Sequence, residues 1–389
     1  MSNACSRDTS RVTIHQVKQN REEALAFRVD ENDVMWIPKD VVRKQIANIL
    51  TAWGMSPEHV ETTSTVMVDA DSCGIDTHGI SMIPPYEDRR KRNVITLDAN
   101  ITVIKETPTT ALIDAGGGLG YVPSILATEM CITKAKECGM AAVTVKESAH
   151  FGATGYYTRM MSRAGLIGIA TTNGSGPRTA PTFGKDGKLS TNPIAFAAPT
   201  KKNDHFSLDM ATTTVAAGKI RNKWNESQKL PFGWASDADG NPSDDPEVYI
   251  SRGGTQTPLG GTPEGGSHKG YGLATMVEIL SASFCGASLD TAPNHGNNKP
   301  GSMEIGHFFL AIDPTQFLGE GEFEDNVDEL INYLHATKPT DPDKPVMVAG
   351  EPENNVRTER ETTGIPMPPG LRGQIKEIAR QCNAAFVFE

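Results

Sequence analysis

Residues 141–171, AAVTVKESAHFGATGYYTRMMSRAGLIGIAT, contain the pattern that decides the fold. The apolar run at residues 141–145 predicts a strand, residues 156–164 predict a helix, and residues 166–171 predict a second strand. Short strands that alternate with helices are typical of a mixed α/β chain. His150 lies where the first strand leads into the helix, and its neighbours are small enough for a ligand to approach closely.

The same patterns extend outward on both sides of this segment. Apolar residues at helical spacing, with Ser56 and Pro57 as a good helix start, predict helices, and short apolar runs predict strands. The expected helices cover residues 41–50, 57–70, 122–137, 271–283 and 370–383, and the expected strands cover 101–104, 110–114 and 308–312. Two polar stretches rich in Gly, Pro, Ser, Thr and Asn, 173–192 and 236–270, are expected to contain loops around a site.

Composition limits the class of protein. A chain of 389 residues usually holds two or three domains or subdomains, and 37 Gly with 25 Pro indicate many turns. The net charge of −11 gives no general electrostatic reason to bind nucleic acid or an anionic membrane. Since the chain has no run of 18 apolar residues, we expect no membrane span.

The cysteines and the N-terminal residues indicate a compartment. The six cysteines form no C-x-x-C pair and read as reduced thiols, although their even number leaves a disulfide framework open. Residues 1–35 are acidic and lack an apolar core segment, so we expect a polar N-terminal extension and no signal peptide. These features together favour a cytoplasmic protein.

The first candidate for chemistry is Asp76-Thr77-His78-Gly79, followed eight residues after His78 by Tyr86. A histidine beside a glycine in a turn is sterically open, and it titrates near neutral pH, which suits general acid–base catalysis. Tyr86 could donate a hydrogen bond to a substrate carbonyl or carboxylate. The alternative is an ordinary histidine in a surface turn.

The second candidate is the turn that contains His150. The helix expected after it would offer free N–H groups and a positive dipole end to an anionic carboxylate or phosphate. The alternative is a structural turn between a strand and a helix.

Two glycine-rich segments invite a nucleotide-binding interpretation. Residues 116–120 lack the Gly-x-Gly-x-x-Gly spacing and the later acidic residue of a Rossmann motif, so a plain glycine turn is the better interpretation. Residues 260–272 place His268 and Lys269 at the start of an expected helix, which favours a phosphate cradle. A flexible loop with a solvated lysine is the alternative.

Metal and serine-hydrolase chemistry have no matching motif. The chain has neither His-Glu-x-x-His nor Gly-x-Ser-x-Gly, so we expect no metal site and no nucleophilic serine. His295, His307 and His335 are isolated and are expected to be structural or exposed.

Several of these segments, in this order, resemble the type-2 malate/L-lactate dehydrogenase family, which also includes sulfolactate and ureidoglycolate dehydrogenases and piperideine-carboxylate reductases. The resemblance covers roughly residues 36–389. The matching segments are residues 74–80, 150–157, 191–193, 209–212, 233–234, 258–261, 268–273 and 306–309.

The resemblance implies a non-Rossmann α/β (α+β) fold that binds NAD or NADP. Its central domain would be a mostly antiparallel sheet, its helical portion would come from both chain ends, and the protein would be a homodimer. The implied division is a polar extension at 1–35, a helical substrate-side part at 36–110, a central NAD(P)-binding sheet domain at 111–310 and a C-terminal part at 311–389.

The implied activity is interconversion of a small 2-oxo acid and its 2-hydroxy acid by hydride transfer, with His78 or His150 as the acid–base. Implied substrate contacts are Thr77, Met82, Tyr86 and Ser148. Implied cofactor contacts are Asn173, Thr191, Asn192, Leu208, Asp209, Met210, His268, Lys269, Gly270, Tyr271, Gly350, Glu351 and Pro352. The alternatives are a reductase of cyclic imine carboxylates and an inactive NAD(P)-binding homologue.

Met82 departs from the family pattern. Four residues after the first histidine the family often has an arginine, which would pair with a substrate carboxylate in bidentate fashion. A methionine cannot bind a carboxylate by charge. Either another donor binds it or the substrate is bulkier and less polar, and malate, with two carboxylates, becomes less attractive. Smaller departures are Ser190, where the family usually has glycine, and Ala217, where it frequently has arginine.

Overall fold

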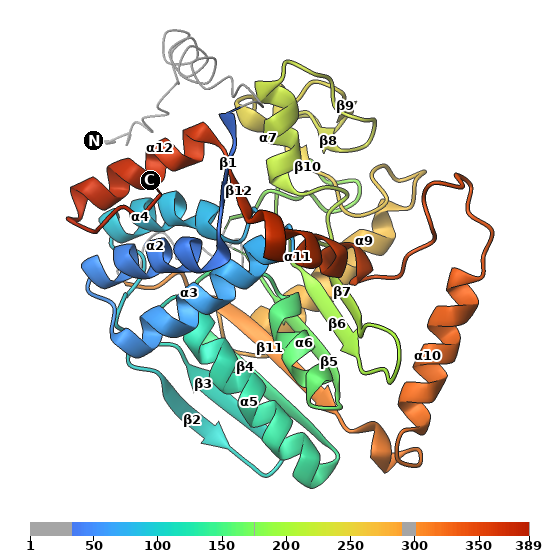
Figure 1. The fold of residues 1–389 in the computed structure, drawn as a ribbon. Coiled ribbons are helices and arrows are strands. Elements are labelled where there is room, and N and C mark those ends of the chain that lie inside the picture. Colours follow the sequence, from blue (N-terminus) through green and yellow to red (C-terminus); the bar gives the residue numbers. More distant parts are fainter. Residues whose placement is uncertain (1–32, 175, 290–300, 389) are drawn as a thin grey trace, which may run out of the picture.

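A seven-stranded mixed sheet forms the centre of the computed structural model, which describes residues 33–174, 176–289 and 301–388 (Figure 1). The strand order is β2-β3-β4-β11-β5-β6-β7. Only the β3–β4 pair is parallel within this sheet, which confirms the expected mostly antiparallel architecture. The strands are β2 (Thr102–Glu106), β3 (Thr110–Asp114), β4 (Met140–Ser148), β5 (Ile167–Thr172), β6 (Ile194–Ala198), β7 (Phe206–Met210) and β11 (Ile305–Ile312).

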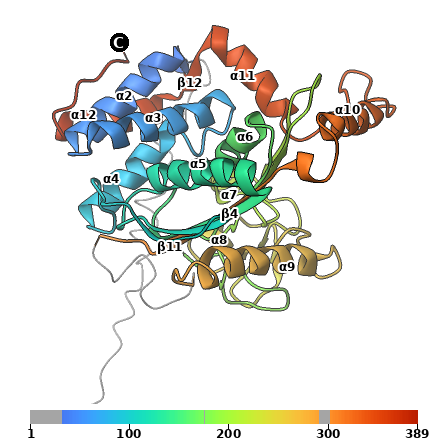
Figure 2. The same ribbon diagram turned by 90° about the horizontal axis from the view of Figure 1, so that it is seen from below.

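Helices cover both faces of this sheet. Helices α5 (Tyr121–Cys138) and α6 (Gly155–Arg163) lie on one face, and α9 (Ser267–Glu278) lies on the other (Figure 2). Strands β4 and β11 carry apolar side chains that alternate toward α5 and α6, so Val143, Val145 and Phe309 are fully buried in one core. Burial on the α5 and α6 side fixes the register of the central strands.

A helical layer drawn from both ends of the chain packs beside the sheet (Figure 1). Strand β1 (Met35–Ile37) pairs antiparallel with β12 (Ile365–Met367), and α12 packs on α2 and α4. Their shared core contains Ile46, Leu50 and Ile375, each fully buried. The helices of this layer are α2 (Lys39–Ala52), α3 (Pro57–Ser72), α4 (Ile83–Lys91), α11 (Glu351–Thr363) and α12 (Pro369–Gln381).

A small three-stranded sheet lies within the stretch expected to be loops. Its order is β10-β8-β9, and it packs with two helices around a separate small core that includes Ile220 and Val248. These elements are α7 (Ala217–Asn225), β8 (Ala235–Ser236), β9 (Pro242–Ser243), α8 (Glu247–Ile250) and β10 (Thr255–Gln256). Residues 236–270 therefore contain loops, as expected, together with short strands and the single helical turn α8, which the sequence did not predict.

Several boundaries and elements differ from the sequence expectation. The helix expected at 271–283 begins at Ser267, because Gly266 adopts φ +90° and ends the glycine loop there, and its last turn is the π-helix η3 (Ile279–Ser283). Helices α10 (Glu322–His335) and α11 were not predicted from the sequence. Most of the expected N-terminal extension, Cys5 and His295 lie outside the described residues. In the part of the chain that the structure describes, no helix is long and apolar enough to cross a membrane.

Candidate active site

The turn that presents His78 is held from below by Asp71, the penultimate residue of α3. The buried Asp71 carboxylate accepts a hydrogen bond of 2.9 Å from the backbone N–H of Ile80, in the 3-10 helix η2 (Ile80–Met82). A Cβ on Gly79 would lie only 1.8 Å from Asp71 Oδ1, so the residue after His78 must be glycine. Burial raises the pKa of Asp71 well above its ordinary value.

Helix α11, the last helix but one, also holds this turn in place. Arg360 binds both carboxylate oxygens of Asp76, at 2.5 and 3.0 Å, and also donates to the backbone carbonyl of Asp71. One turn earlier in α11, Arg357 pairs with Asp69 of α3 at 2.8 Å. Asp69 also pairs with Arg159 of α6, so three helices meet at its carboxylate. The position of His78 therefore depends on residues close to the end of the chain.

The turn that presents His150 is held by the glycine loop at residues 116–120. The N–H of Gly120 donates to the carbonyl of His150 at 3.0 Å. A Cβ on Gly120 would lie 2.7 Å from the Ala149 carbonyl oxygen and 2.7 Å from Nε2 of His307, so only glycine allows this approach. The interpretation of this loop as a structural turn is confirmed, and the turn also places Tyr121 at the start of α5.

The two histidine turns meet at the centre of the site. The rings of His78 and His150 stack with their centroids 5.4 Å apart and their planes 28° apart. Nδ1 of His150 lies 2.6 Å from the hydroxyl of Tyr86, and that hydroxyl lies 2.7 Å from the hydroxyl of Tyr121. Nδ1 of His78 lies 2.8 Å from Oγ1 of Thr77. The structure thus brings together four residues expected from the sequence and adds Tyr121, whose only sequence signal is its place after the glycine turn.

Burial controls the charge of this cluster. It lowers the pKa of His78 to about 4 and lowers the pKa of His150 well below its ordinary value. Positive charge on His78, Arg89 or His307 lowers the pKa of His150 further. Burial also raises the pKa of both Tyr86 and Tyr121. At neutral pH the site is therefore a pair of neutral imidazoles beside two neutral phenols.

Arg89 of α4 borders the cluster. Its guanidinium carbon lies 5.6 Å from the ring centroid of Tyr86, within the range of a cation–π contact. Its Nη1 atom is buried and has no hydrogen-bond partner among the described residues. Desolvation by burial lowers the pKa of Arg89.

Neither Met82 nor Ser148 offers a free polar group to a substrate. Met82 is half-buried and packs on the apolar core of the helical layer, so it adds no charge to the site. Ser148 is fully buried, and its hydroxyl lies 2.8 Å from Nε2 of His307. The structure therefore places Ser148 beneath the site, against the expectation of a substrate contact, because the hydroxyl satisfies a buried imidazole.

Two further histidines, His307 and His335, have partners that indicate a structural role. His307 is fully buried, bonds Thr172 Oγ1 at 2.7 Å and stacks on Phe151 with ring centroids 4.3 Å apart. Burial lowers the pKa of His307 to about 3. His335 lies 2.9 Å from the carboxylate of Glu351. No group of three or more His, Cys, Asp or Glu within the described ranges is arranged to hold a metal ion.

Part of the expected cofactor set converges on Glu278 of α9. The Asn192 amide donates to Glu278 Oε2 at 2.9 Å, and the Asn173 amide lies 3.4 Å from Oε1. The carbonyl of Thr191 accepts from the N–H of Thr212 at 2.9 Å. The Asn192 amide oxygen is buried with no hydrogen-bond partner in the described part of the chain. Such an oxygen can accept a hydrogen bond from a carboxamide or a ribose hydroxyl.

A second part of the expected cofactor set lies on or beside strand β7, which contains Leu208, Asp209 and Met210. Gly350 packs on this strand, where the N–H of Ser207 donates to Ala349 at 2.9 Å. Of the other three expected contacts, Gly350 directly precedes helix α11, and Glu351 and Pro352 are the first residues of that helix. The Asp209 carboxylate accepts a 2.7 Å hydrogen bond from the N–H of Gly155. The N–H of Gly155, at the start of α6, is therefore already hydrogen-bonded within the protein. The expectation that this helix start offers free N–H groups to an anion is wrong for Gly155.

The third part of the expected cofactor set, residues His268 to Tyr271, lies in the first turns of α9. This helix covers the face of the sheet opposite to α5 and α6 (Figure 2). His268 and Lys269 are exposed, and their side chains make no hydrogen bond or ion pair within the described residues. A Cβ on Gly270 would lie 2.2 Å from the N atom of Leu259, so glycine is required there. An unpaired lysine at a helix start and a buried unpaired amide oxygen on Asn192 fit the phosphate and carboxamide groups of a nicotinamide dinucleotide.

Residues 37–376 match the family described as malate/L-lactate dehydrogenase. The chain belongs to this family. A relative within it, the malate/(S)-sulfolactate dehydrogenase of Methanothermus fervidus, is 37% identical over 356 residues, which cover 91% of this chain and 100% of the relative. The L-sulfolactate dehydrogenase of Methanocaldococcus jannaschii is 38% identical and covers 88% of this chain and 94% of its own.

Solved structures of malate/L-lactate dehydrogenase family members share the fold. Malate dehydrogenase from Entamoeba histolytica superposes with a TM-score of 0.86 at 31% identity, covering 92% of this chain and 100% of that one. The delta1-piperideine-2-carboxylate reductase from Pseudomonas syringae gives a TM-score of 0.78 at 25% identity, covering 89% and 100%. Family membership therefore accounts for the mostly antiparallel sheet and for the failure of the Rossmann motif at residues 116–120.

Proposed function

We propose that this protein is an NAD(P)-dependent dehydrogenase that interconverts a 2-hydroxy acid and a 2-oxo acid. The observation that carries the proposal is the stacked, neutral His78–His150 pair, joined to the Tyr86–Tyr121 hydroxyls in a dehydrogenase-family fold. Relatives named malate, sulfolactate and hydroxycarboxylate dehydrogenase support this class of substrate.

His150 is the proposed acid–base residue. Its ring is oriented through Nδ1 by Tyr86, which leaves Nε2 for the hydroxyl of a 2-hydroxy acid. When Nε2 takes that proton, Nδ1–H donates to the Tyr86 oxygen, and Tyr86 can in turn donate to Tyr121. Because Tyr86 has this second partner, the hydroxyl chain itself can adapt to either tautomer of the imidazole. The backbone N–H of Gly152 also donates to Nδ1, at 3.3 Å, so the form with a proton on Nδ1 gives up this long hydrogen bond. In the reverse direction the imidazolium returns the proton to the oxygen that was the carbonyl.

His78 and Thr77 are proposed to orient the substrate. His78 lies against His150, and its Nδ1 is held by Thr77, so its Nε2 can hold the reacting oxygen or the carboxylate. Since both imidazoles are neutral in the free protein, binding of an anionic substrate beside them raises their pKa values and stabilises the protonated form. Substrate binding and protonation are therefore coupled.

A nicotinamide cofactor, NAD or NADP, would accept or donate the hydride when bound. The residues proposed to hold it are Asn173, Thr191, Asn192, Leu208, Asp209, Met210, His268, Lys269, Gly270, Tyr271, Gly350, Glu351 and Pro352. Within this set, Lys269 would pair with phosphate oxygens, while Asn192 would accept a hydrogen bond through its unpaired amide oxygen.

Replacement of each histidine tests the proposal. We expect His150→Gln to lower kcat for oxidation of the 2-hydroxy acid by about a hundredfold or more, because positioned acid–base groups contribute on that order. We expect His78→Gln to raise KM as well as lower kcat. Formation of reduced cofactor at 340 nm gives the rates, and fluorescence titration with NADH and NADPH checks cofactor binding. Near wild-type turnover by both variants would contradict the assignment, and failure of the wild type to bind either cofactor would indicate an inactive homologue.

A second candidate is reduction of a cyclic imine carboxylate. Met82 suits the bulkier and less polar ring of such a substrate, and a solved structure that shares the fold is named delta1-piperideine-2-carboxylate reductase. A panel of 2-oxo acids and cyclic imine acids, each tested with both cofactors, separates the two candidates. Turnover of the imine acids alone would replace the first proposal with the second.

The assembly and the division of the chain are proposed from the family resemblance. We propose a cytoplasmic homodimer, with a helical part at 36–110, a sheet part at 111–310 and a C-terminal part at 311–389. Sedimentation velocity should give about twice the chain mass of 41.8 kDa. A species at the single-chain mass throughout the micromolar range would contradict the dimer.

A further inference from the structure

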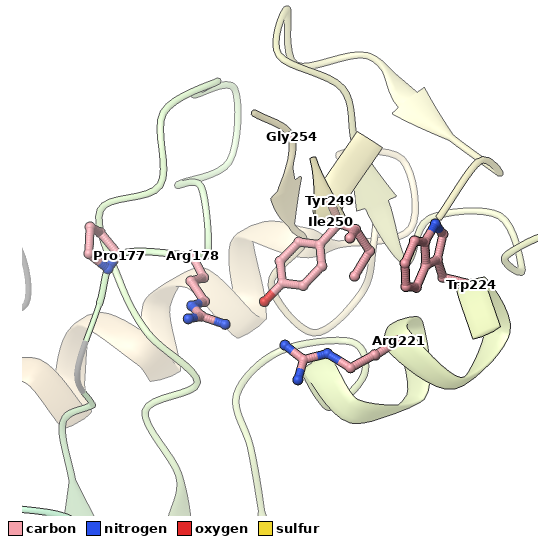
Figure 3. A pocket seen from close by; sticks show the side chains of 7 residues that line it. All are labelled: Pro177, Arg178, Arg221, Trp224, Tyr249, Ile250 and Gly254. Atoms are coloured by element: carbon pink, nitrogen blue, oxygen red, sulfur yellow. The ribbon is translucent and has the colours of Figure 1, made fainter. Parts of the chain in front are cut away.

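A cleft of about 510 Å³ lies between the loop at residues 177–178 and the small unit formed by α7 and α8 (Figure 3). Its lining combines two arginines, Arg178 and Arg221, with the side chains of Trp224, Tyr249 and Ile250. The volume falls within the range of small-molecule sites. None of these five residues belongs to the histidine cluster or to the proposed cofactor set.

The two arginines of the cleft carry uncompensated charge. Neither guanidinium makes a hydrogen bond or an ion pair with any residue that the structure describes, and both side chains are exposed. Arg252, in the same small unit, is by contrast paired with Asp245 and Glu247 at 2.9 and 2.7 Å. Figure 3 shows both unpaired guanidinium groups turned toward the cleft, with the Tyr249 hydroxyl extending between them. The cleft is therefore a place where hydrogen-bond donors and positive charge converge.

Hydrogen bonds between its two walls form the cleft in advance of any ligand. The N–H of Gln256, in β10, donates to the carbonyl of Arg178 at 2.8 Å, and the Tyr249 hydroxyl lies 3.4 Å from Oε1 of Gln256. Within the small unit, Ile220 is fully buried and holds the backbone beside Arg221. The arginine side chains can change rotamer, but the backbones that carry them stay at a fixed separation.

The loop that forms one wall also contacts the surroundings of the proposed cofactor set. Oγ1 of Thr179 donates to the carbonyl of Ser190 at 2.9 Å, and Oγ1 of Thr182 lies 3.0 Å from Oγ of Ser267. Both serines directly precede residues of the proposed cofactor set in the chain. This wall is therefore one residue away from two parts of the proposed cofactor site.

The small unit, which forms the other wall, leads into the same region. Leu259 follows Gln256 by three residues, and its carbonyl accepts a hydrogen bond of 3.2 Å from the N–H of Gly270 in α9. The N–H of Leu259 donates to the carbonyl of Thr212 at 2.9 Å, two residues after Met210. Both walls of the cleft thus continue, within a few residues, into the proposed cofactor site.

We propose that this cleft binds the adenosine 2′-phosphate of NADP, so that this chain prefers NADP to NAD. The proposal rests on the proposed dehydrogenase function and narrows its cofactor. Two guanidinium forks suit a phosphate by charge and geometry, and arginine also accommodates the 2′-phosphate of NADP in dinucleotide folds of another class. Trp224 and Ile250 offer an apolar surface to the adenine. NAD has a hydroxyl at this position and would leave both guanidinium groups without an anion.

NADPH and NADH are matched probes, because they differ only in the 2′-phosphate. Fluorescence titration of the full-length protein, without substrate, compares their Kd values. We expect the wild type to bind NADPH at least about tenfold more tightly, and the double variant Arg178→Gln, Arg221→Gln to lose this preference through weaker binding of NADPH. Lys223→Gln is the control, because Lys223 lies on the same helix but bonds Gln228 and Glu226. Equal binding of the two probes by the wild type, or an unchanged preference in the double variant, would overturn the proposal.

Competition separates a cofactor subsite from an independent nucleotide site. The probe 2′,5′-ADP carries the 2′-phosphate without the nicotinamide, so it should displace NADPH from the wild type and do so more weakly from the double variant. Simultaneous binding of 2′,5′-ADP and NADPH would overturn the proposal in favour of a separate nucleotide site. A wild type that prefers NADPH but turns over no 2-hydroxy acid would refute the dehydrogenase function and support the cleft assignment. Turnover with equal KM for NAD and NADP would refute the cleft assignment alone.

Discussion

The hydroxyl oxygen of Tyr86 lies 2.6 Å from Nδ1 of His150, although the two residues are 64 positions apart in the chain. Tyr86 comes from α4 in the helical layer, and His150 follows strand β4 of the central sheet. The contact therefore joins the two layers at the proposed acid–base residue. It also makes the proton chemistry of His150 depend on a phenol, a group that stays neutral at physiological pH.

Removal of this hydroxyl should slow proton transfer. We expect Tyr86→Phe to lower kcat by about tenfold to a hundredfold, because the imidazole loses the group that orients its ring and accepts its Nδ1 hydrogen. Tyr121→Phe should have a smaller effect of the same kind. Tyr156→Phe is the control, since the Tyr156 hydroxyl lies outside this hydrogen-bonded chain. Stopped-flow measurement of the hydride step checks the order, and equal rates in all three variants would exclude a role for the chain.

The lowered pKa values of the histidines predict the pH dependence of oxidation. Abstraction of a proton requires a neutral imidazole, and burial lowers the pKa of His78 to about 4 and that of His150 well below its usual value. The value of kcat/KM for 2-hydroxy acid oxidation should thus be constant from about pH 6 to 8, because it reports groups of the free enzyme. An inflection near the ordinary histidine value, at about pH 6.5, would contradict neutral burial of the pair.

The same burial predicts a loss of stability in acid. The pKa of His307 is about 3 in the folded protein and about 6.5 when unfolded, so the unfolded chain binds more protons between these values. The free energy of unfolding should therefore fall as pH decreases through this window, by about 1.4 kcal/mol per pH unit for this group. Urea unfolding of the wild type and His307→Gln at pH 7, 6 and 5 isolates the contribution of His307. Parallel pH profiles for the two proteins would show that His307 does not titrate on unfolding.

Gly79 should tolerate no side chain. The Cβ of alanine there would lie 1.8 Å from Asp71 Oδ1, so Gly79→Ala must displace either the His78 turn or the buried carboxylate. We expect a loss of about 1–3 kcal/mol in the free energy of unfolding and a larger proportional loss in kcat. Gly373→Ala is a suitable control, because a Cβ there meets no atom within 4 Å and the residue lies inside α12. The control should be neutral or slightly stabilising, and equal destabilisation of both variants would contradict the steric argument.

Some of this architecture could be predicted from the sequence because burial leaves a periodic pattern. Strands β4 and β5 and the helices beside them follow the apolar runs at residues 141–171. Helix α11 left no such signal, since none of its residues is buried and its role is to present Arg357 and Arg360 to α3 and the His78 turn. A polar helix of this kind is recognisable only through its partners.

The site was predictable to the extent that it lies in unusual turns. Thr77, His78, Tyr86 and His150 meet as the sequence indicates. Ser148 does not join them, because strand alternation turns its hydroxyl toward buried His307. Tyr121 was missed because a tyrosine after a glycine turn has no distinguishing pattern, and its importance comes from contact with a residue 35 positions earlier.

The bond between Arg360 and Asp76 spans 284 positions, so the contact that holds the His78 turn comes from a segment made long after the turn itself. Synthesis proceeds from the N-terminus, and a chain still being translated carries both histidines long before Arg360 leaves the ribosome. A product that ends before α11 would therefore have every proposed proton-transfer residue without the contact that holds Asp76 in place. The Asp76 contact in the active centre can therefore form only once α11 has been translated, however early the histidines are made.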